Sequence, residues 1–454
     1  MTTRPPITRL ANRELEQGLA VAQLLRQVDS PQSPVARQQL LTNDLVSLLC
    51  SSGVGALAWS VISKSELAKT PAGLELHDAY RRQRLSARRH ERDIETVISQ
   101  LRAAGVEPVL VKGWAIARHY ADPALRPYGD IDLCVSPNQF ANASEVLKEI
   151  ESIDGPFVDL HSGFNGIGVG KRLFAPSLRN AQREWDELYS RTRLVALCNV
   201  QRQTTNVNGT NKVPGPSALD IGQSLPVRVL SDEDHLRVLC VHMLRSGARR
   251  PTWLCDVAVM LSPKSSKASP KSNVQSPQSS FGAQTLDIGP WILDSKRPFD
   301  WTLALGDGDD PVHANYVATS VQLAHELLGA NVSQTPFAGT RAPRWIVAEV
   351  LKQWGGGSVQ SSMSKVKSPG VERRFWPLDF GHWTNLYRRW NNPIRATAAV
   401  GGTFTEKPRL RHRISELIAR LPEVPNQLRE FQLARKRHRA PARLVADLRN
   451  QTIY

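Results

Sequence analysis

The stretch VLVKGWAIARHYADPALRPYGDIDLCV, residues 109–135, decides the fold of this chain. It opens with a short β-type run that ends at Lys112 and Gly113, and the following WAIARHYA is typical of the start of a helix. It closes with GDIDLCV, in which apolar residues alternate with Asp130 and Asp132. This alternation predicts a strand with one apolar face and one acidic face.

Further elements are predicted on both sides of this stretch. Upstream, residues 10–104 have helical patterning, and Gly105 stands where a C-terminal cap would end an amphipathic helix. Downstream, SPNQFANASEVLKEIES is patterned as a helix, and FVDLHSGF, which contains Asp159, as a third strand. Helical patterning returns after Ser231, a candidate N-cap. The sequence therefore predicts a small α/β unit between two helical segments.

The length of 454 residues is too great for one ordinary domain. Turn-rich and Ser/Pro/Lys-rich segments mark the expected boundaries between the folded units. The predicted organisation is an N-terminal helical region at 1–104, a core with the candidate site at 105–198, a loop or insertion at 199–229, a helical domain at 230–350 with a disordered insert at 262–282, a flexible linker at 351–372 and a basic C-terminal region at 373–454.

Composition limits the partners and the compartment. The net charge of +16 favours polyanionic partners, and much of the excess lies near the C-terminus, where RKRHR occupies 435–439. The five cysteines form no CxxC pair, which suits reduced thiols. No signal peptide and no apolar run of the ~18 residues that a spanning helix needs is present, so we expect a cytoplasmic protein without a membrane segment.

The acidic residues have the spacing of a site for divalent cations. Asp130 and Asp132, at i and i+2 on one strand, point the same way and could bridge two cations about 3.5–4 Å apart. Asp159 on the neighbouring strand is the candidate third ligand, since such cations prefer carboxylate oxygens. Gly113 at a strand-to-helix turn would let backbone N–H groups approach phosphates. For any single acid, an ordinary turn or edge position remains the alternative.

These motifs resemble a known family. The order of a strand, Lys-Gly, a helix, Arg-Pro and Gly-Asp-Ile-Asp is similar to the uncharacterised nucleotidyltransferase family of the DNA polymerase β superfamily. VDLH at 158–161 resembles the strand of the third carboxylate, and HLRVLCVHMLRSGARRPTWLCDVAVML resembles the helical region that follows it. One departure is that Trp114 follows Gly113, where the superfamily more usually has a serine whose hydroxyl contacts the triphosphate.

The resemblance implies a fold and an activity. The fold would be α+β, with a small mixed β-sheet core flanked by helices and a helical second domain. The activity would be transfer of a nucleoside monophosphate from a nucleoside triphosphate to an acceptor, with Mg²⁺ or Mn²⁺ as the cofactor. Catalytic and metal-binding roles would fall to Asp130, Asp132 and Asp159.

Five further residues are candidates for the site. Lys112 and Arg126 could bind the triphosphate together with Gly113, although Lys112 could also be a solvated lysine and Arg126 could pair with Asp122 or Asp130. The possible substrate cleft includes His161, His242 and Asp256. For the two histidines, packing within the fold is the alternative.

The acceptor is not identified by the sequence: a small molecule, a peptide, a protein or an RNA would all fit. Two other functions are considered. One is a catalytically degenerate module of the same fold that binds a nucleotide or a partner. The other is a nucleic-acid-binding protein that uses the basic C-terminal region.

Overall fold

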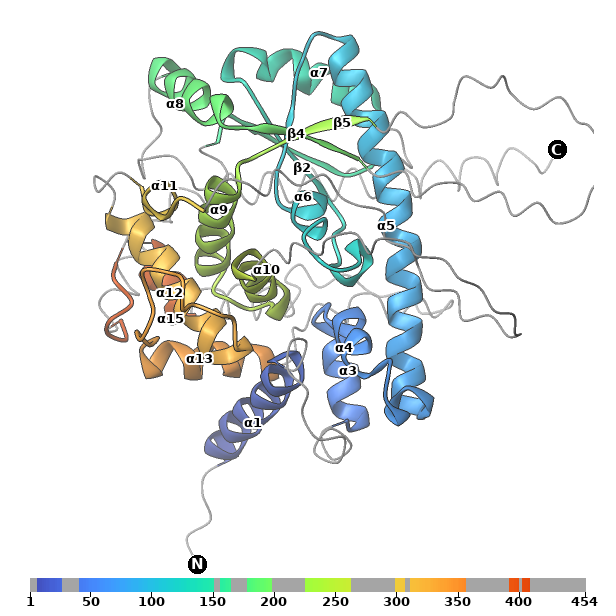
Figure 1. Ribbon diagram of the computed structural model, residues 1–454, viewed down its shortest axis with the longest axis vertical. Helices are drawn as coiled ribbons and strands as arrows, with labels where there is room; N and C mark the ends of the chain where they lie inside the picture. Colours follow the sequence, from blue (N-terminus) through green and yellow to red (C-terminus); the bar gives the residue numbers. More distant parts are fainter. Residues whose placement is uncertain are drawn as a thin grey trace, which may run out of the picture.

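A mixed β-sheet lies at one end of the molecule, and helices make up the rest (Figure 1). The computed structural model describes residues 6–26, 41–150, 156–164, 178–197, 225–262, 299–306, 311–356, 392–399 and 402–408. The strands are β1 (Val109–Leu110), β2 (Ile131–Val135), β3 (Val158–Ser162), β4 (Arg193–Ala196) and β5 (Pro226–Val229).

The sheet has the order β3-β2-β1-β5-β4. β1 runs antiparallel to β2 and parallel to β5, β2 runs parallel to β3, and β4 runs antiparallel to β5. The predicted order of strand, helix, strand, helix, strand is confirmed by β1, α6 (Gly113–Ala117), β2, α7 (Phe140–Ile150) and β3. The mixed sheet and its flanking helices confirm the α+β fold.

The register of β2 and β3 sets the position of the candidate acids. In this parallel pair Asp132 is the partner of Asp159, and Cys134 is the partner of His161. Residues that are partners in neighbouring strands point to the same face of a sheet. Asp132 and Asp159 are therefore neighbours on one face, and His161, two residues after Asp159, lies on that face as well.

β5 is the principal difference from the expected organisation. The range 199–229 was expected to be a loop or insertion, but its last residues, Pro226–Val229, form a strand between β1 and β4. Val227 and Val229 are fully buried. The polar, turn-rich sequence before these residues predicted a loop. Burial between β1 and β4 instead makes Pro226–Val229 a strand.

The long helix α5 (Pro71–Ala103) runs along the side of the molecule and joins its sheet end to its helical end (Figure 1). Its buried face includes Ile94, Val97, Ile98 and Leu101, which confirms the predicted amphipathic pattern. Gly105 just after it has φ +76°, as expected for the C-terminal cap. These apolar residues form one core with the sheet and α7.

Most of the other described helices pack into a second apolar core. Trp185 and Leu188, in the helix Leu178–Ser190 (α8), belong instead to a third, smaller core with Val109, Val111 and Cys134. α9 (Asp232–Arg245) follows β5 and begins at the sheet, and α10 (Pro251–Leu261) packs beside α9 toward the helical end (Figure 1). The side chain of Ser231 accepts a hydrogen bond from the backbone N–H of Asp234, which confirms the predicted N-cap of α9. The helices not yet given are α1 (Pro6–Arg26), α3 (Asn43–Ser51), α4 (Gly55–Ile62), α11 (Trp301–Leu305), α12 (Pro311–Leu328), α13 (Arg344–Gly355) and α15 (Pro393–Ala399), and the 3₁₀ turns are η1 (Glu66–Lys69), η2 (Pro123–Leu125) and η3 (Pro137–Gln139).

Several sequence predictions lie outside the described residues. They include the insert at 262–282 beyond Ser262, the linker at 351–372 beyond residue 356, and the basic region after residue 408. The division into domains therefore stays a prediction. None of the helices in the described ranges is long and apolar enough to cross a membrane.

A half-buried carboxyl group on α5 predicts a pH dependence of stability. Trp114 Nε1 donates a hydrogen bond to Glu91 Oε1 over 3.2 Å. Burial raises the pKa of Glu91 from 4.5 to about 7, and the hydrogen bond from Trp114 offsets only part of this effect. The pKa of Glu91 is therefore higher in the folded state than in the unfolded state. At a pH between these two pKa values, the folded state binds more protons than the unfolded state.

The free energy of unfolding is therefore expected to fall by about 1–2 kcal/mol as the pH rises from about 5 to 7. Urea denaturation at a series of pH values measures this slope. Glu91→Gln is expected to remove that part of the slope, and a variant with the full slope of the native chain would contradict the assignment.

Candidate active site

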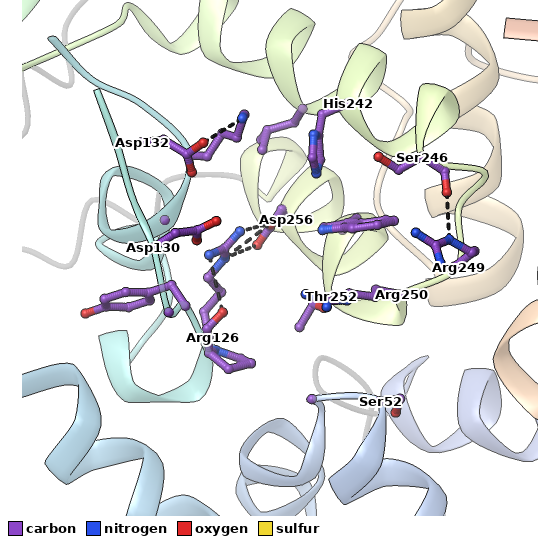
Figure 2. A pocket seen from close by; sticks show the side chains of 18 of the residues that line it. Ser52, Arg126, Asp130, Asp132, His242, Ser246, Arg249, Arg250, Thr252 and Asp256 are labelled. Carbon is purple, nitrogen blue, oxygen red and sulfur yellow. Dashed lines mark hydrogen bonds and ion pairs between the residues drawn. The ribbon is translucent and has the colours of Figure 1, made fainter. Parts of the chain in front are cut away.

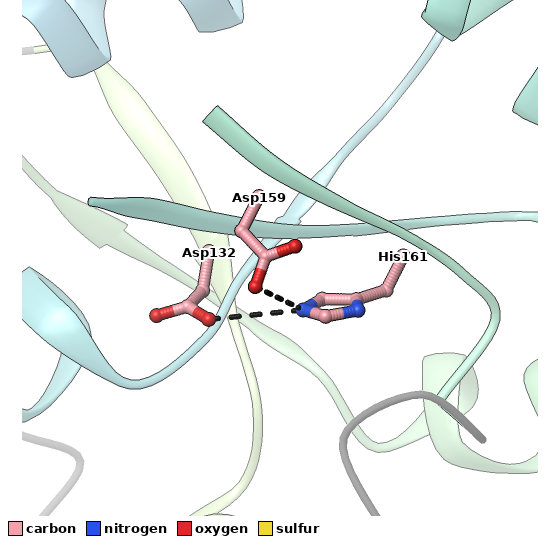
Figure 3. Close-up of side chains that lie close together, drawn as sticks. All are labelled: Asp132, Asp159 and His161. Atoms are coloured by element: carbon pink, nitrogen blue, oxygen red, sulfur yellow. Dashed lines mark ion pairs between the residues drawn. The ribbon is translucent and has the colours of Figure 1, made fainter. Parts of the chain in front are cut away.

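Two acids and a histidine meet on one face of the sheet. The side chains of Asp132 in β2 and of Asp159 and His161 in β3 each offer one ligand atom, and these atoms lie within 4.8 Å of one another. Figure 3 shows both carboxylates pointing toward the imidazole ring. The Asp132 side chain is 6% exposed and that of Asp159 is 47% exposed. One acid of the pair is therefore buried and the other is accessible from solvent.

Two basic side chains compensate the charge of these acids. Lys112 Nζ lies 2.7 Å from Asp132 Oδ1. His161 Nε2 lies 3.3 Å from Asp159 Oδ2 and 3.7 Å from Asp132 Oδ1. The Lys112 side chain is only 12% exposed, so the alternative of a solvated lysine is wrong.

The ionisation of the cluster follows from these contacts. Burial disfavours the charged imidazole of His161, but the neighbouring carboxylates of Asp132 and Asp159 outweigh it and raise the pKa of His161 to about 9. Burial also opposes ionisation of Asp132, yet His161 and Lys112 lower its pKa. The neighbouring imidazole of His161 lowers the pKa of Asp159 despite burial. At neutral pH the cluster therefore holds two carboxylates facing two cationic side chains.

Asp130 is placed differently from the other two acids. It precedes β2, is exposed, and lines the same cleft as Asp132 and Asp159. Within the described part of the chain, it does not belong to the group of ligand atoms within 4.8 Å of one another. His90 Nε2 lies 3.2 Å from the backbone oxygen of Asp130 and fixes the main chain there. The structure thus brings two of the three expected acids together and leaves the third at the edge of the cleft.

The Lys112–Gly113 turn has an unusual backbone. Lys112 has φ +50° and Gly113 has φ +30°, in the left-handed region that favours glycine. The backbone N–H of Lys112 donates to His235 Nε2 over 3.1 Å. Burial lowers the pKa of His235 well below its ordinary value, so its ring is neutral and can accept this bond. Trp114 is 1% exposed, and its indole packs inside the core where a serine hydroxyl would otherwise be available.

A cleft of about 520 Å³ lies in front of the acids. One wall carries Asp130 and Asp132, and the opposite wall comes from α9, α10 and the turn between them (Figure 2). Asp159 also lines the cleft. A third side is formed by residues 51–53 at the end of α3. A cleft of this size is in the range of small-molecule sites in proteins.

Arg126 and Asp256 join the two walls. Arg126 Nη2 lies 2.8 Å from Asp256 Oδ2, and Arg126 Nε lies 3.1 Å from Asp256 Oδ1. Tyr120 donates its hydroxyl proton to the same carboxylate over 2.8 Å. Arg126 therefore pairs with neither Asp122 nor Asp130, the partners considered from the sequence. Its partner is Asp256, which is 130 residues away in the chain. Asp256 is fully buried and lies between the two walls of the cleft (Figure 2).

His242 lines the cleft as the sequence suggested, and it is also packed. Its ring meets Trp253 edge to face at 5.0 Å between centroids. Burial lowers the pKa of His242 to about 3, so it is neutral. His242 is therefore both a residue of the cleft lining and a packing residue.

Sequence reasoning missed several cleft residues. They are Ser51–Gly53, Arg249, Arg250, Thr252 and Trp253. The segment RSGARRPTW carries a usable signal, since a glycine turn with two arginines and an aromatic residue ends a helix that already held His242.

The mixed sheet with paired carboxylates beside a glycine turn has the features that the sequence resemblance implied for a nucleotidyltransferase. A protein-family model described as an uncharacterised nucleotidyltransferase matches residues 42–270, and the chain belongs to this family. Searches of curated proteins and of solved structures each returned no match.

Proposed function

We propose that the protein transfers a nucleoside monophosphate from a nucleoside triphosphate to an acceptor with the help of divalent cations. The observation that carries this proposal is the pairing of Asp132 with Asp159 on adjacent strands at the wall of the cleft. Membership of the family supports a transferase and a nucleoside triphosphate as its substrate. Mg²⁺ or Mn²⁺, the acceptor and the roles of the single residues are part of the proposal.

The chemistry of the donor set fits a hard divalent cation. Asp132 and Asp159 offer carboxylate oxygens, and Asp130 offers another from the edge of the cleft. Two acids side by side, one buried and one half exposed, repel each other, and here Lys112 and His161 supply the compensating charge. When bound there, Mg²⁺ or Mn²⁺ would activate the acceptor hydroxyl and neutralise charge on the triphosphate.

The side chains of the cleft have distinct parts in this reaction. The acceptor oxygen forms a bond to the α-phosphorus, the bond from that phosphorus to the bridging oxygen breaks, and pyrophosphate leaves with the electron pair. Asp159, the more exposed acid, orients the acceptor hydroxyl and takes its proton. The ammonium group of Lys112 lies beside Asp132 and adds positive charge near the phosphates. Gly113 has no side chain to obstruct their approach to the turn.

A second candidate is a module of the same fold that binds a nucleotide without transferring it. Trp114 favours this candidate, because its buried indole replaces the hydroxyl that contacts the triphosphate in many relatives of the superfamily. Binding of nucleic acid by the basic C-terminal region stays a prediction, since residues after 408 lie outside the described chain.

Label transfer tests the proposal. The purified chain is incubated with each of the four labelled ribonucleoside triphosphates, Mg²⁺ or Mn²⁺ and a cell extract. We expect one or more labelled products that require the metal and disappear with EDTA. Without the cation, the carboxylates of the site would repel the negatively charged triphosphate. Nucleotide binding without any label transfer would favour the binding module instead.

A further inference from the structure

His161 is the third side chain of the acid cluster, and one atom of its ring lies where the two carboxylates converge. This atom, Nε2, is 3.3 Å from Asp159 Oδ2 and 3.7 Å from Asp132 Oδ1. Figure 3 shows both contacts ending on the same nitrogen of the ring. A neutral imidazole binds a metal ion through one of its two ring nitrogens. Both acids therefore face an atom that can itself be a metal ligand.

The two contacts have the spacing of metal ligands rather than the geometry of a hydrogen bond. A hydrogen bond between charged N–H and oxygen is about 2.7–2.9 Å long. His161 Nε2 is buried and makes no hydrogen bond with any residue in the described part of the chain. Two atoms that bind one ion, each about 2.1 Å from it, lie about 3–4 Å apart. The distances of 3.3 and 3.7 Å from His161 Nε2 to the two acids fall in this range.

The sheet fixes these three side chains relative to one another. Asp159 and His161 are two residues apart on β3 and point to the same face, and the register places Asp132 beside Asp159. The His161 side chain is only 15% exposed. A site on strands is held more precisely than a site on loops. The imidazole is therefore a fixed part of the cluster.

The position of His161 favours a role toward an ion over direct contact with the substrate. Among the described residues, Asp132 and Asp159 line the cleft, whereas His161 does not. Its ring reaches the acids from β3, and its nitrogen contacts them where they approach each other. A substrate in the cleft would therefore meet the acids, and an ion between the acids would meet His161.

This ligand set differs from the one that the sequence predicted. Three carboxylates were expected, from Asp130, Asp132 and Asp159, and a set of oxygen ligands alone suits Mg²⁺. In the described part of the chain Asp130 lies outside the cluster, and His161 has the third position in it. Imidazole nitrogen is a common ligand of transition-metal ions, whereas Mg²⁺ prefers oxygen. Two carboxylates with one imidazole therefore favour Mn²⁺ over Mg²⁺.

Lys112 keeps the site basic when a cation is bound. A cation takes the place of the proton on His161 Nε2, because one lone pair can hold only one of the two. Lys112, whose ammonium group lies 2.7 Å from Asp132 Oδ1, is then the remaining basic side chain of the cluster. Its charge and that of a divalent cation together exceed the charge of the two carboxylates. The balance favours a negatively charged triphosphate.

We infer that His161 is a nitrogen ligand of the proposed cation site and gives this site a preference for Mn²⁺ over Mg²⁺. The inference rests on the proposed function for what the cation does in nucleotidyl transfer. The assignment of the nitrogen to the same ion as the two carboxylates rests on the geometry of the cluster.

Pulsed electron paramagnetic resonance of Mn²⁺ bound to the full chain tests the inference. A directly bound imidazole gives a nitrogen hyperfine coupling, and oxygen ligands give none. The native chain, stripped of metal and given Mn²⁺, is expected to show this coupling. His161→Gln is expected to lose it, because the amide offers an oxygen in place of the ring nitrogen. His77→Gln is the matched control and should keep the coupling, since His77 stacks on Trp59 and is not part of the cluster.

Calorimetric titration with Mn²⁺ and with Mg²⁺ measures the preference. The native chain is expected to bind Mn²⁺ on the order of 10- to 100-fold more tightly than Mg²⁺, and His161→Gln is expected to bring this ratio close to one. If His161 acted only as a compensating charge, its replacement would change both affinities alike. The ratio therefore distinguishes a ligand from a neighbouring charge.

Several results would overturn the inference. They are the absence of nitrogen coupling in the native chain, its persistence in His161→Gln, and an unchanged ratio of the two affinities in that variant. Thermal unfolding shows whether His161→Gln is folded, and His161→Asn takes its place if it is not. If neither variant folds, the native chain with isotope-labelled histidine decides the result, because the coupling must change with the isotope. In the described part of the chain, His161 is the histidine with a ring nitrogen in the acid cluster.

The proposed function can fail separately. If Mn²⁺ binds with the nitrogen coupling but no label is transferred, the His161 ligand stands and nucleotidyl transfer does not. If label transfer depends on Asp132 while the native chain shows no nitrogen coupling, the transferase stands and the assignment of His161 does not. A native chain that binds neither Mn²⁺ nor Mg²⁺ would refute both.

Discussion

Replacement of Asp132 by Asn is expected to lower label transfer by at least roughly 10³-fold while the chain stays folded. Asn has the same shape but carries no charge, and its amide nitrogen cannot ligate a divalent cation. Asp132 is the buried member of the acid pair and contacts both Lys112 and His161. Its loss therefore removes the central ligand of the proposed cation site. The measurement is the initial rate of label transfer at saturating Mg²⁺.

The control for this prediction is Asp186→Asn. Asp186 is an exposed carboxylate on α8 that accepts a hydrogen bond from Gln182 Nε2, so its loss should leave transfer unchanged. The midpoint of thermal unfolding separates a loss of chemistry from a loss of folding. If Asp132→Asn kept its metal-dependent transfer at the native rate, the acid pair would not be the cation site.

Part of the site could be predicted because its signals are local. The two-residue spacing of Asp130 and Asp132, and of Asp159 and His161, follows from the alternation of side chains along a strand. The strands of both pairs, at 131–135 and 158–162, are confirmed. What the spacing could not supply is the register, because the pairing of Asp132 with Asp159 is set by contacts between strands. Asp130 was expected in the same cluster, but it precedes the first residue of β2 and so lacks the partner that the register gives Asp132.

Other parts of the site depend on residues that are far apart in the chain. The pairing of Arg126 with Asp256 and the contact of His235 with Lys112 leave no local pattern. β5 follows a long polar segment and joins the sheet only through pairing with β1 and β4. Propensity and turn signals describe a neighbourhood of a few residues, whereas these contacts come from the packing of two cores against each other.

Arg126, Tyr120 and Asp256 form a buried polar network between the walls of the cleft, and its loss is expected to lower stability strongly. Asp256→Ala is expected to lower the free energy of unfolding by about 3–5 kcal/mol, because it leaves the buried Arg126 guanidinium without its counter-charge. Burial opposes the charged form of Arg126, but Coulombic attraction and hydrogen bonding by Asp256 raise the pKa of Arg126 overall. The same carboxylate accepts the hydroxyl of Tyr120, so a second buried polar group also loses its partner. Urea denaturation followed by circular dichroism measures the change.

A double-mutant cycle separates this pairing from a direct role in phosphate binding. Arg126→Met/Asp256→Leu removes both charges, and it is expected to be less destabilised than the sum of its two single variants, because neither charge is left buried alone. Glu66→Ala breaks the exposed Glu66–Lys69 pair and should change stability by less than about 1 kcal/mol, which makes it the matched control. If Arg126 instead contacted the substrate phosphates, Arg126→Met would leave stability nearly unchanged and raise the KM for the nucleoside triphosphate. Additive destabilisation in the cycle would likewise show that Arg126 and Asp256 act independently, and that the walls of the cleft are held together by other contacts.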